Sequence, residues 1–212
     1  MAGSRAERRL RILDELLVLI EGMLDGGEPF SDISVERLAG AASMSRTRFY
    51  LYFEDKNDLI MAWFGRIREG LAAAGARWWD ADPPPDREAL TELAEQTLRA
   101  YRPHATLMAA VEEVAAVDAA VRAEVDAAVA ADTDALRAHI ERGQASGAID
   151  PGLDADAVAR WLTLMHWRGR RHLLRGAGQA ELARVAGSYS ALLWNVLYAG
   201  RPVSSCGSSP SR

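Results

Sequence analysis

Residues 32–56 read DISVERLAGAASMSRTRFYLYFEDK, and the spacing of small and apolar residues in this stretch predicts a helix-turn-helix. The first helix needs a small residue where the second helix crosses it, and Ala39 supplies one. The tight turn then needs a backbone that tolerates positive φ; glycine is usual there, and Ser43 replaces it. Met44 would anchor the turn, and Phe49 would point back into the core. Any helical hairpin in an all-α protein can satisfy these positions, so the neighbouring residues must separate the two interpretations.

The residues that would open the second helix are polar and basic. In a helix-turn-helix these residues face the base edges of the major groove, where arginine can donate two hydrogen bonds to guanine. Tyrosine hydroxyls can reach phosphates, and helix starts attract them through free backbone N–H groups. The predicted DNA contacts are Ser34, Ser45, Arg46, Thr47, Arg48, Tyr50, Tyr52 and Lys56.

Four further arginines lie between Arg5 and Arg11, ahead of the first amphipathic stretch. They would suit an arm that follows the DNA backbone, because such contacts depend on charge and not on sequence. A solvated and frayed chain terminus would have the same composition. Both interpretations stay open at this point.

Helical periodicity extends over most of the remaining chain, and no stretch has the length or alternation of a strand. The first helix, with apolar residues from Leu13 to Leu24, should end at the glycine pair 26–27. The prolines at 83–85 mark a corner. Three helices are expected before Glu54 and six after it, the latter over 56–78, 87–101, 105–114 and 118–143 and starting again at Asp154 and Gln179.

The composition narrows the class of protein. The chain has 212 residues, a formal net charge of −5 and one cysteine, Cys206. No apolar run approaches the roughly 18 residues that cross a membrane, and no signal peptide is recognisable, so a cytoplasmic protein is expected. The four histidines lack metal-ligand spacing, and neither a Gly-x-Ser-x-Gly motif nor a phosphate-binding glycine loop is present. We therefore expect no enzyme activity, no cofactor and no metal.

The blocks 32–39 (DISVERLA) and 45–56 (SRTRFYLYFEDK) resemble the signature of the TetR family of transcriptional regulators. That signature is an Ile-x-x-Leu-Ala helix, a turn, and a Phe/Leu-Tyr-x-Tyr/His-Phe block followed by lysine. The detailed match covers about a quarter of the chain, and Ser43 departs from it. Within the family, the shared Asp-Ile-Ser-Val and Phe-Tyr-x-Tyr-Phe blocks and Trp194 are most similar to the mycobacterial ethionamide-resistance repressor.

The resemblance implies an all-α chain with a three-helix DNA-binding domain over 1–54, a six-helix ligand-binding and dimerisation domain over 55–200, and a disordered tail over 201–212. Two apolar helices at the chain end favour a homodimer over a monomer core. Aromatic, flexible and polar residues suit an apolar pocket, and the predicted ligand contacts are Tyr101, Met108, Trp161, Thr163, Met165, His166 and Trp194. The basic residues of the run 168–172, namely Arg168, Arg170, Arg171 and His172, are expected on the helix surface or in interface salt bridges.

The predicted function is that of a TetR-type regulator, a repressor. It would bind a palindromic double-stranded DNA operator as a dimer and would be released by a small, largely apolar effector. The alternative is a TetR-like DNA-binding protein without a small-molecule effector, acting as an architectural factor or through a protein partner. A helical enzyme is a distant third interpretation.

Overall fold

A computed structural model describes residues 4–81 and 84–199. In these ranges the chain is entirely helical, without strands, as predicted. Three helices come before Glu54 and six after it, which confirms the predicted order. The nine α-helices of the described ranges are α1 (Arg5–Asp25), α2 (Val35–Ala41), α3 (Arg46–Tyr50), α4 (Lys56–Trp79), α5 (Arg87–Tyr101), α6 (Ala105–Val117), α7 (Ala119–Ala145), α8 (Ala155–Leu174) and α9 (Gln179–Leu197).

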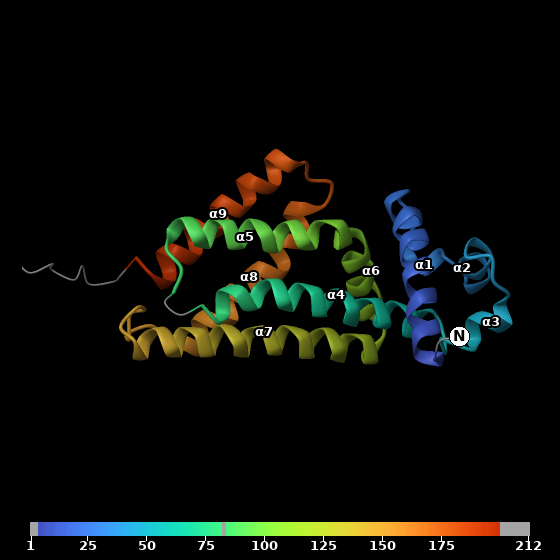
Figure 1. The fold of residues 1–212 in the computed structure, drawn as a ribbon, viewed down its shortest axis with the longest axis horizontal. Coiled ribbons are helices and arrows are strands. Elements are labelled where there is room, and N and C mark those ends of the chain that lie inside the picture. Colours follow the sequence, from blue (N-terminus) through green and yellow to red (C-terminus); the bar gives the residue numbers. More distant parts are fainter. Residues whose placement is uncertain (1–3, 82–83, 200–212) are drawn as a thin grey trace, which may run out of the picture.

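The helices form a small group at one end of an elongated body (Figure 1). Helices α1 to α3 make up the small group, which we call the head. Helices α4, α5 and α7 run lengthwise through the body, while α8 and α9 pack on α7 and α5 respectively. Helix α4 starts at the head, and α6 packs on both α1 and α4. The head is therefore joined to the body through α4 and α6.

Side-chain caps define most helix starts, because the first backbone N–H groups of a helix lack partners within it. Ser34, Ser45 and Asp55 cap α2, α3 and α4, as predicted. Helix α1 ends at Gly26, and Gly27 turns the chain with a φ of 87°. The largest differences from the predicted boundaries are that α3 ends at Tyr50, before the expected residues 52–53, and that α6 and α7 continue to Val117 and Ala145, past the expected 114 and 143. Of the predicted proline corner, Pro83 lies outside the described residues, as does the predicted tail.

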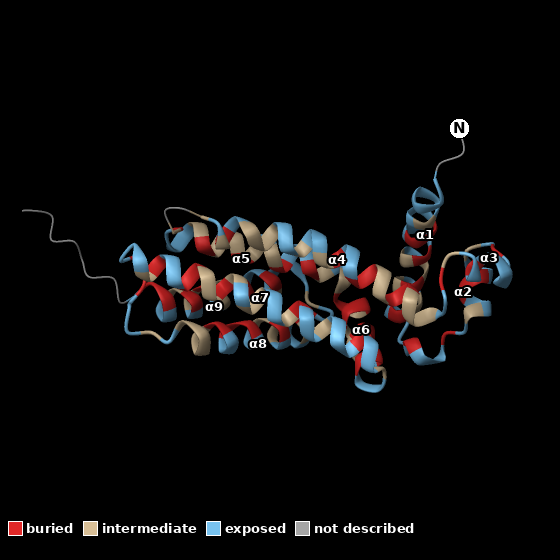
Figure 2. Ribbon diagram, turned by 90° about the horizontal axis from the view of Figure 1, so that it is seen from below, coloured by how far each residue is buried: buried red, intermediate tan, exposed pale blue. Residues whose placement is uncertain are grey.

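One hydrophobic core extends from the head into the body. It includes Leu16 of α1, Phe49 of α3, Trp63 of α4 and Val111 of α6. Figure 2 shows in red the buried stretches of α1, α4 and α6. The indole N–H of Trp63 also donates to the carbonyl oxygen of Leu13, at 2.8 Å. Because the core crosses residue 54 without a break, the division into domains at that point stays a prediction.

A second buried cluster lies at the other end of the body, around Trp78, Leu90, Ile140 and Tyr198. The Tyr198 hydroxyl accepts a hydrogen bond from the Trp78 indole N–H at 3.1 Å and lies 2.6 Å from His139 Nε2. These contacts fasten the end of α9 to α4 and α7. Nowhere in the described part of the chain is a helix long and apolar enough to span a lipid bilayer.

Candidate functional site

The turn between α2 and α3 has the geometry that the sequence predicts. Ser43 has a φ of 51° and is the only non-glycine residue with positive φ in ranges 4–81 and 84–199. The backbone N–H of Met44 donates to the Ala39 carbonyl at 2.9 Å, which closes the turn. Ala39 and Phe49 are buried beneath it. The pair α2–α3 is therefore a helix-turn-helix with a strained residue where glycine is usual.

The exposed face of α3 carries basic and polar side chains. Arg46 pairs with the Glu36 carboxylate of α2, and its guanidinium lies 5.6 Å from the centre of the Tyr50 ring. Thr47 and Arg48 are exposed, and their side chains have no hydrogen-bond or ion-pair partner among the residues that the structure describes. Arg48 thus carries an unpaired charge on this face, whereas Arg46 is held in place by its neighbours.

The other predicted DNA contacts have roles within the head. The hydroxyls of Ser34 and Ser45 each accept a backbone N–H at 3.2 Å as helix caps. Tyr52 is half-buried against the core. The ammonium group of Lys56 donates to the carbonyl oxygens of Phe30 and Ser31. These bonds use two of the three ammonium N–H groups, and the phosphate contact of Lys56 stays a prediction.

The arginines at the start of α1 lie in an ordered helix, so this segment is not frayed; Arg5 and Arg9 are bound within the head, while Arg8 and Arg11 are exposed. Ser4 caps α1 in a capping box with Glu7. Arg5 Nη2 donates to the Leu51 carbonyl at 2.8 Å, and Arg9 Nε donates to the Tyr52 carbonyl at 3.0 Å. Both side chains thus bind carbonyls at the C-terminal end of α3, where the helix dipole favours cations. They position the helix-turn-helix against α1.

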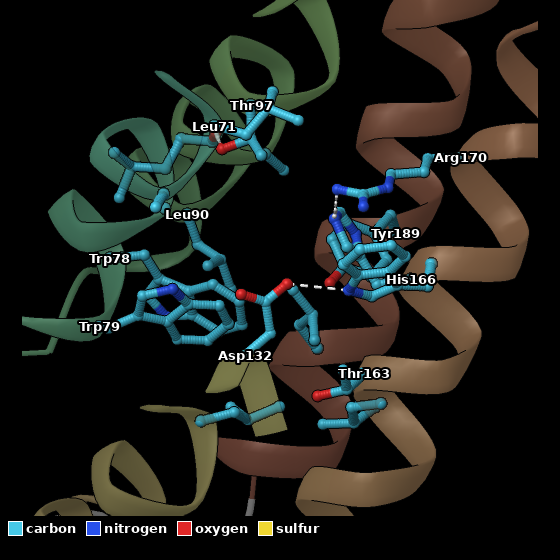
Figure 3. A pocket seen from close by; sticks show the side chains of 18 of the residues that line it. Leu71, Trp78, Trp79, Leu90, Thr97, Asp132, Thr163, His166, Arg170 and Tyr189 are labelled. Atoms are coloured by element: carbon cyan, nitrogen blue, oxygen red, sulfur yellow. Dashed lines mark hydrogen bonds between the residues drawn. The ribbon is translucent and has the colours of Figure 1, made fainter. Parts of the chain in front are cut away.

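A cavity of about 70 Å³ lies in the body among α4, α5, α7, α8 and α9. One water-sized group needs roughly 10–15 Å³ in this measure, so the cavity exceeds a single water several times. Figure 3 shows Trp78, Trp79 and Leu90 on one side and His166, Arg170 and Tyr189 opposite them. Most of the wall is apolar, with a few polar groups directed inward, as in small-molecule pockets.

Arg170 of α8 is the most unusual group on this wall. The side chain is buried, and its guanidinium lies 4.6 Å from the ring centre of Tyr101 and 4.3 Å from that of Trp167. Its Nη1 lies 3.4 Å from Nε2 of His166, a weak contact in which the arginine donates. Asp132 on α7 accepts the indole N–H of Trp167 at 2.8 Å.

The ionisation of the cavity wall follows from its burial. Desolvation, together with the charge of Arg170, lowers the pKa of His166 to about 3. Desolvation also raises the pKa of Tyr189. At neutral pH His166 is therefore an uncharged imidazole whose Nε2 accepts from Arg170, and Tyr189 keeps its hydroxyl proton. No cluster that could hold a metal ion occurs among residues 4–81 and 84–199.

Large apolar side chains are exposed on the last two helices. Of the eleven exposed large apolar residues in the described chain, six belong to α8 or α9: Trp161, Leu164, Met165, Leu173, Leu192 and Val196. Trp161 is 76% exposed. An exposed patch of this kind is typical of a surface that meets another protein chain.

No family model matches the sequence, and neither does any curated protein. Solved structures do resemble it in fold. PfmR, a TetR family transcriptional regulator from Thermus thermophilus, has a TM-score of 0.64 at 22% identity, covering 88% of this chain and 98% of its own. GusR from Salmonella enterica has a TM-score of 0.70 at 21% identity, with coverage of 92% and 97%. The ketosteroid transcriptional regulator KstR2 of Mycobacterium tuberculosis has a TM-score of 0.62 at 19% identity, with coverage of 93% and 97%.

The chain has the fold of TetR-family regulators. These comparisons do not bear on the narrower resemblance to the ethionamide-resistance repressor, which stays a prediction. The helix-turn-helix lies in the N-terminal head and the cavity in the helical body.

On this TetR fold, two of the seven predicted ligand residues line the cavity, namely Thr163 and His166. Tyr101 stacks on Arg170 behind the wall, and Met108 is buried in the core shared with the head. Trp194 packs on the second cluster and does not reach the cavity.

Trp161 and Met165 do not line the cavity, so the predicted pocket needs correction. The inward face of α8 carries Thr163, His166, Trp167 and Arg170, which follow the three- and four-residue helical spacing. Residues 161, 164 and 165 lie outside that phase. Large side chains occur on two faces of α8, and their size alone does not tell which face turns inward.

Arg170, Asp132 and Tyr189 were not predicted as cavity residues. Arg170 was expected on the helix surface with the rest of the basic run, and the structure buries it. Its neighbours Arg168 and Arg171 do pair with the Glu112 carboxylate of α6. The sequence does contain one indication that Arg170 points inward: its spacing from Thr163 and His166 puts all three residues on one face of the helix.

Proposed function

We propose that this chain is a DNA-binding transcriptional regulator of the TetR type, a repressor that binds a palindromic operator as a homodimer and dissociates when a small molecule occupies the body. The observation that carries the proposal is the α2–α3 motif, whose second helix exposes Arg46, Thr47 and Arg48 at one end of the molecule. Exposed arginine at the start of a recognition helix suits base edges in the major groove.

Dimerisation is proposed through α8 and α9. Their exposed apolar side chains would be covered by the same helices of a second copy in a two-fold four-helix arrangement. Burying apolar surface contributes about 25 cal/mol per Å², so side chains as large as Trp161 and Leu192 supply a strong drive. A two-fold dimer would present two copies of α3 to half-sites one helical turn apart, about 34–36 Å.

The proposed route from cavity to DNA is α4. Its residues Arg68, Leu71 and Trp78 line the cavity, and the same helix begins at Lys56, directly after the helix-turn-helix. A ligand that prefers one position of α4 would change the separation of the two heads by differential binding. To shift the ratio of two conformations from 1:99 to 99:1, a ligand must bind one of them about 5.5 kcal/mol more favourably than the other. Several buried methylene groups, at about 0.8 kcal/mol each, can supply this difference.

The DNA part of the proposal is tested by selecting bound fragments from random double-stranded DNA with the full chain. We expect a palindromic consensus whose affinity falls in Arg48→Ala. The matched control is Arg77→Ala, on α4 and far from α3. If no sequence is enriched, the architectural alternative is favoured over an operator-binding regulator. If Arg48→Ala and Arg77→Ala lose affinity to the same extent, α3 is not the recognition helix.

The dimer is tested separately by sedimentation at micromolar concentration. Trp161→Glu and Leu192→Glu put charges on exposed positions of α8 and α9, so each protomer should still fold. We expect the dimer to dissociate in both variants. Val18→Glu, on the exposed side of α1, is the control and should leave the mass unchanged.

A further inference from the structure

The cavity wall carries more positive than negative charge. Its charged residues are Arg68 on α4, Asp132 on α7 and Arg170 on α8. His166 is uncharged and Tyr189 stays protonated at neutral pH, because desolvation opposes the charged form of each. Two guanidinium groups thus face one carboxylate across a small apolar space.

Arg170 has no carboxylate partner in the described chain. The residue is only 6% exposed, its guanidinium touches two aromatic faces and one histidine nitrogen, and no ion pair within 4.0 Å involves it. Aromatic faces attract a guanidinium but leave its N–H groups in the ring plane unused. Since no fully buried side-chain nitrogen lacks a partner in the described residues, its remaining N–H groups must reach open space.

Asp132 forms no ion pair with Arg170, although its negative charge acts on that guanidinium from a distance and opposes the lowering of its pKa by burial. One of its oxygens accepts the Trp167 indole N–H at 2.8 Å, which fixes the carboxylate beside Trp167 and outside ion-pair distance of Arg170. Arg68, on the other side of the cavity, also lacks an ion-pair partner in the described residues. A buried charge without a counterion is unfavourable. An anion that enters the cavity would supply the counterion and the hydrogen-bond acceptors that these guanidinium groups lack.

The rest of the wall sets the shape of such an anion. Leu71, Leu90, Leu93, Leu162, Leu193 and Trp78 surround the space with apolar groups. A volume of about 70 Å³ holds roughly five water-sized groups, which excludes a bulky headgroup. The planar fork of a guanidinium matches a carboxylate in two parallel hydrogen bonds.

We propose that the cavity binds a small monocarboxylic acid, with its carboxylate on Arg170 and its apolar part among the leucines. The inference rests on the proposed function only in taking this acid as the effector. An uncharged apolar molecule of the same size would fill the leucine side and leave Arg170 without a counterion. The charged end of the ligand therefore decides recognition, and the apolar end adds affinity.

The test is calorimetric titration of the full chain, without DNA, using propanoate and butanoate against propan-1-ol and butan-1-ol. We expect each acid to bind at least about tenfold more tightly than its alcohol, a ratio that corresponds to about 1.4 kcal/mol. Arg170→Met keeps an unbranched apolar stem without the guanidinium and should abolish the preference. Arg170→Lys should keep part of it, and Arg99→Met, on the exposed side of α5, should keep all of it.

Two controls separate the possible failures. If Arg170→Met does not fold, the wild-type preference must still disappear as the pH falls below the pKa of the acid, because the neutral acid then resembles the alcohol. Equal binding of acids and alcohols, or binding of neither, overturns the assignment. An acid that binds through Arg170 but leaves operator affinity unchanged upholds the assignment and overturns only its role as effector.

Discussion

The ammonium nitrogen of Lys56 lies 2.7 Å from the carbonyl oxygen of Ser31 and 3.2 Å from that of Phe30. The same nitrogen lies 5.2 Å from the centre of the Phe30 ring. The first residue of α4 is thereby fastened to the loop that precedes α2. We expect these bonds to be the main role of Lys56, in preference to the phosphate contact that its position at a helix start suggests.

Lys56→Ala should therefore weaken the fold of the head. Hydrogen bonds from charged donors contribute about 1.5–3 kcal/mol when buried, and partial exposure of Lys56 reduces this to about 1 kcal/mol. The measurement is the free energy of unfolding in urea, with Lys56→Met retaining the aliphatic stem as the control. The slope of log affinity against log salt should stay as in the wild type. A slope reduced by about one, with unchanged stability, would restore the phosphate contact.

Arg48→Ala should cost about 1–3 kcal/mol of operator affinity and relax specificity at one base position. Arg46→Ala should have the same effect, but Arg46 differs from Arg48 in being paired with the Glu36 carboxylate. Because Glu36 holds the Arg46 guanidinium, Glu36→Gln should loosen Arg46 and leave Arg48 unaffected. The measurement is affinity across operators with single-base changes. A uniform loss over all of them, in both arginine variants, would mean that neither side chain reads a base.

Ser43→Gly should stabilise the protein by about 1 kcal/mol, because a side chain at positive φ is strained. Its hydroxyl makes no hydrogen bond in the described structure, so nothing is lost with it. Ser188→Gly, within α9, is the contrasting control and should lower stability by roughly 0.5–1 kcal/mol. Melting temperature and operator affinity are the two readouts. A lower melting temperature for Ser43→Gly would contradict the strain.

Stability should fall in mild acid through His166. Its folded pKa of about 3 lies below the ordinary value of 6.5, because of desolvation and the Arg170 charge. Below pH 6.5 the unfolded chain binds a proton at this residue, whereas the folded chain binds it only near pH 3. The contribution of His166 to the free energy of unfolding is therefore complete above pH 6.5 and is lost as the pH falls. The slope for one such group is at most about 1.4 kcal/mol per pH unit. His139, whose pKa burial also lowers, acts in the same direction.

The experiment compares unfolding free energies from about pH 7 to about pH 4 for the wild type, His166→Gln and His139→Gln, a range in which the linked proton uptake should appear. Each variant should show a shallower fall than the wild type. His172→Gln, an exposed position on α8, is the control and should follow the wild-type curve. Parallel curves for all four proteins would place the acid sensitivity in the carboxylates.

The local structure of the head could be predicted almost completely from the sequence, because it depends on residues close together in the chain. Capping by Ser45 and the left-handed turn at Ser43 are of this kind. The cavity could be predicted only in part. Whether α8 turns Trp161 or Thr163 inward depends on which of its faces meets α4, α7 and α9, and helical periodicity leaves that choice open. Because Trp194 lies outside the cavity, Trp194→Ala should leave ligand binding in place.

The tryptophans that surround the cavity allow ligand binding to be followed by intrinsic fluorescence. Trp78, Trp79 and Trp167 lie on the wall, and Trp167 is in contact with the Arg170 guanidinium. Trp63 is buried where α4 meets α1 and does not line the cavity, whose nearest wall residue on the same helix is Arg68. Indole emission responds to nearby charge and to water, so an occupant would change the spectrum of the first group without a dye. With Trp63 as the single remaining tryptophan, the emission would instead follow the junction between the head and the body.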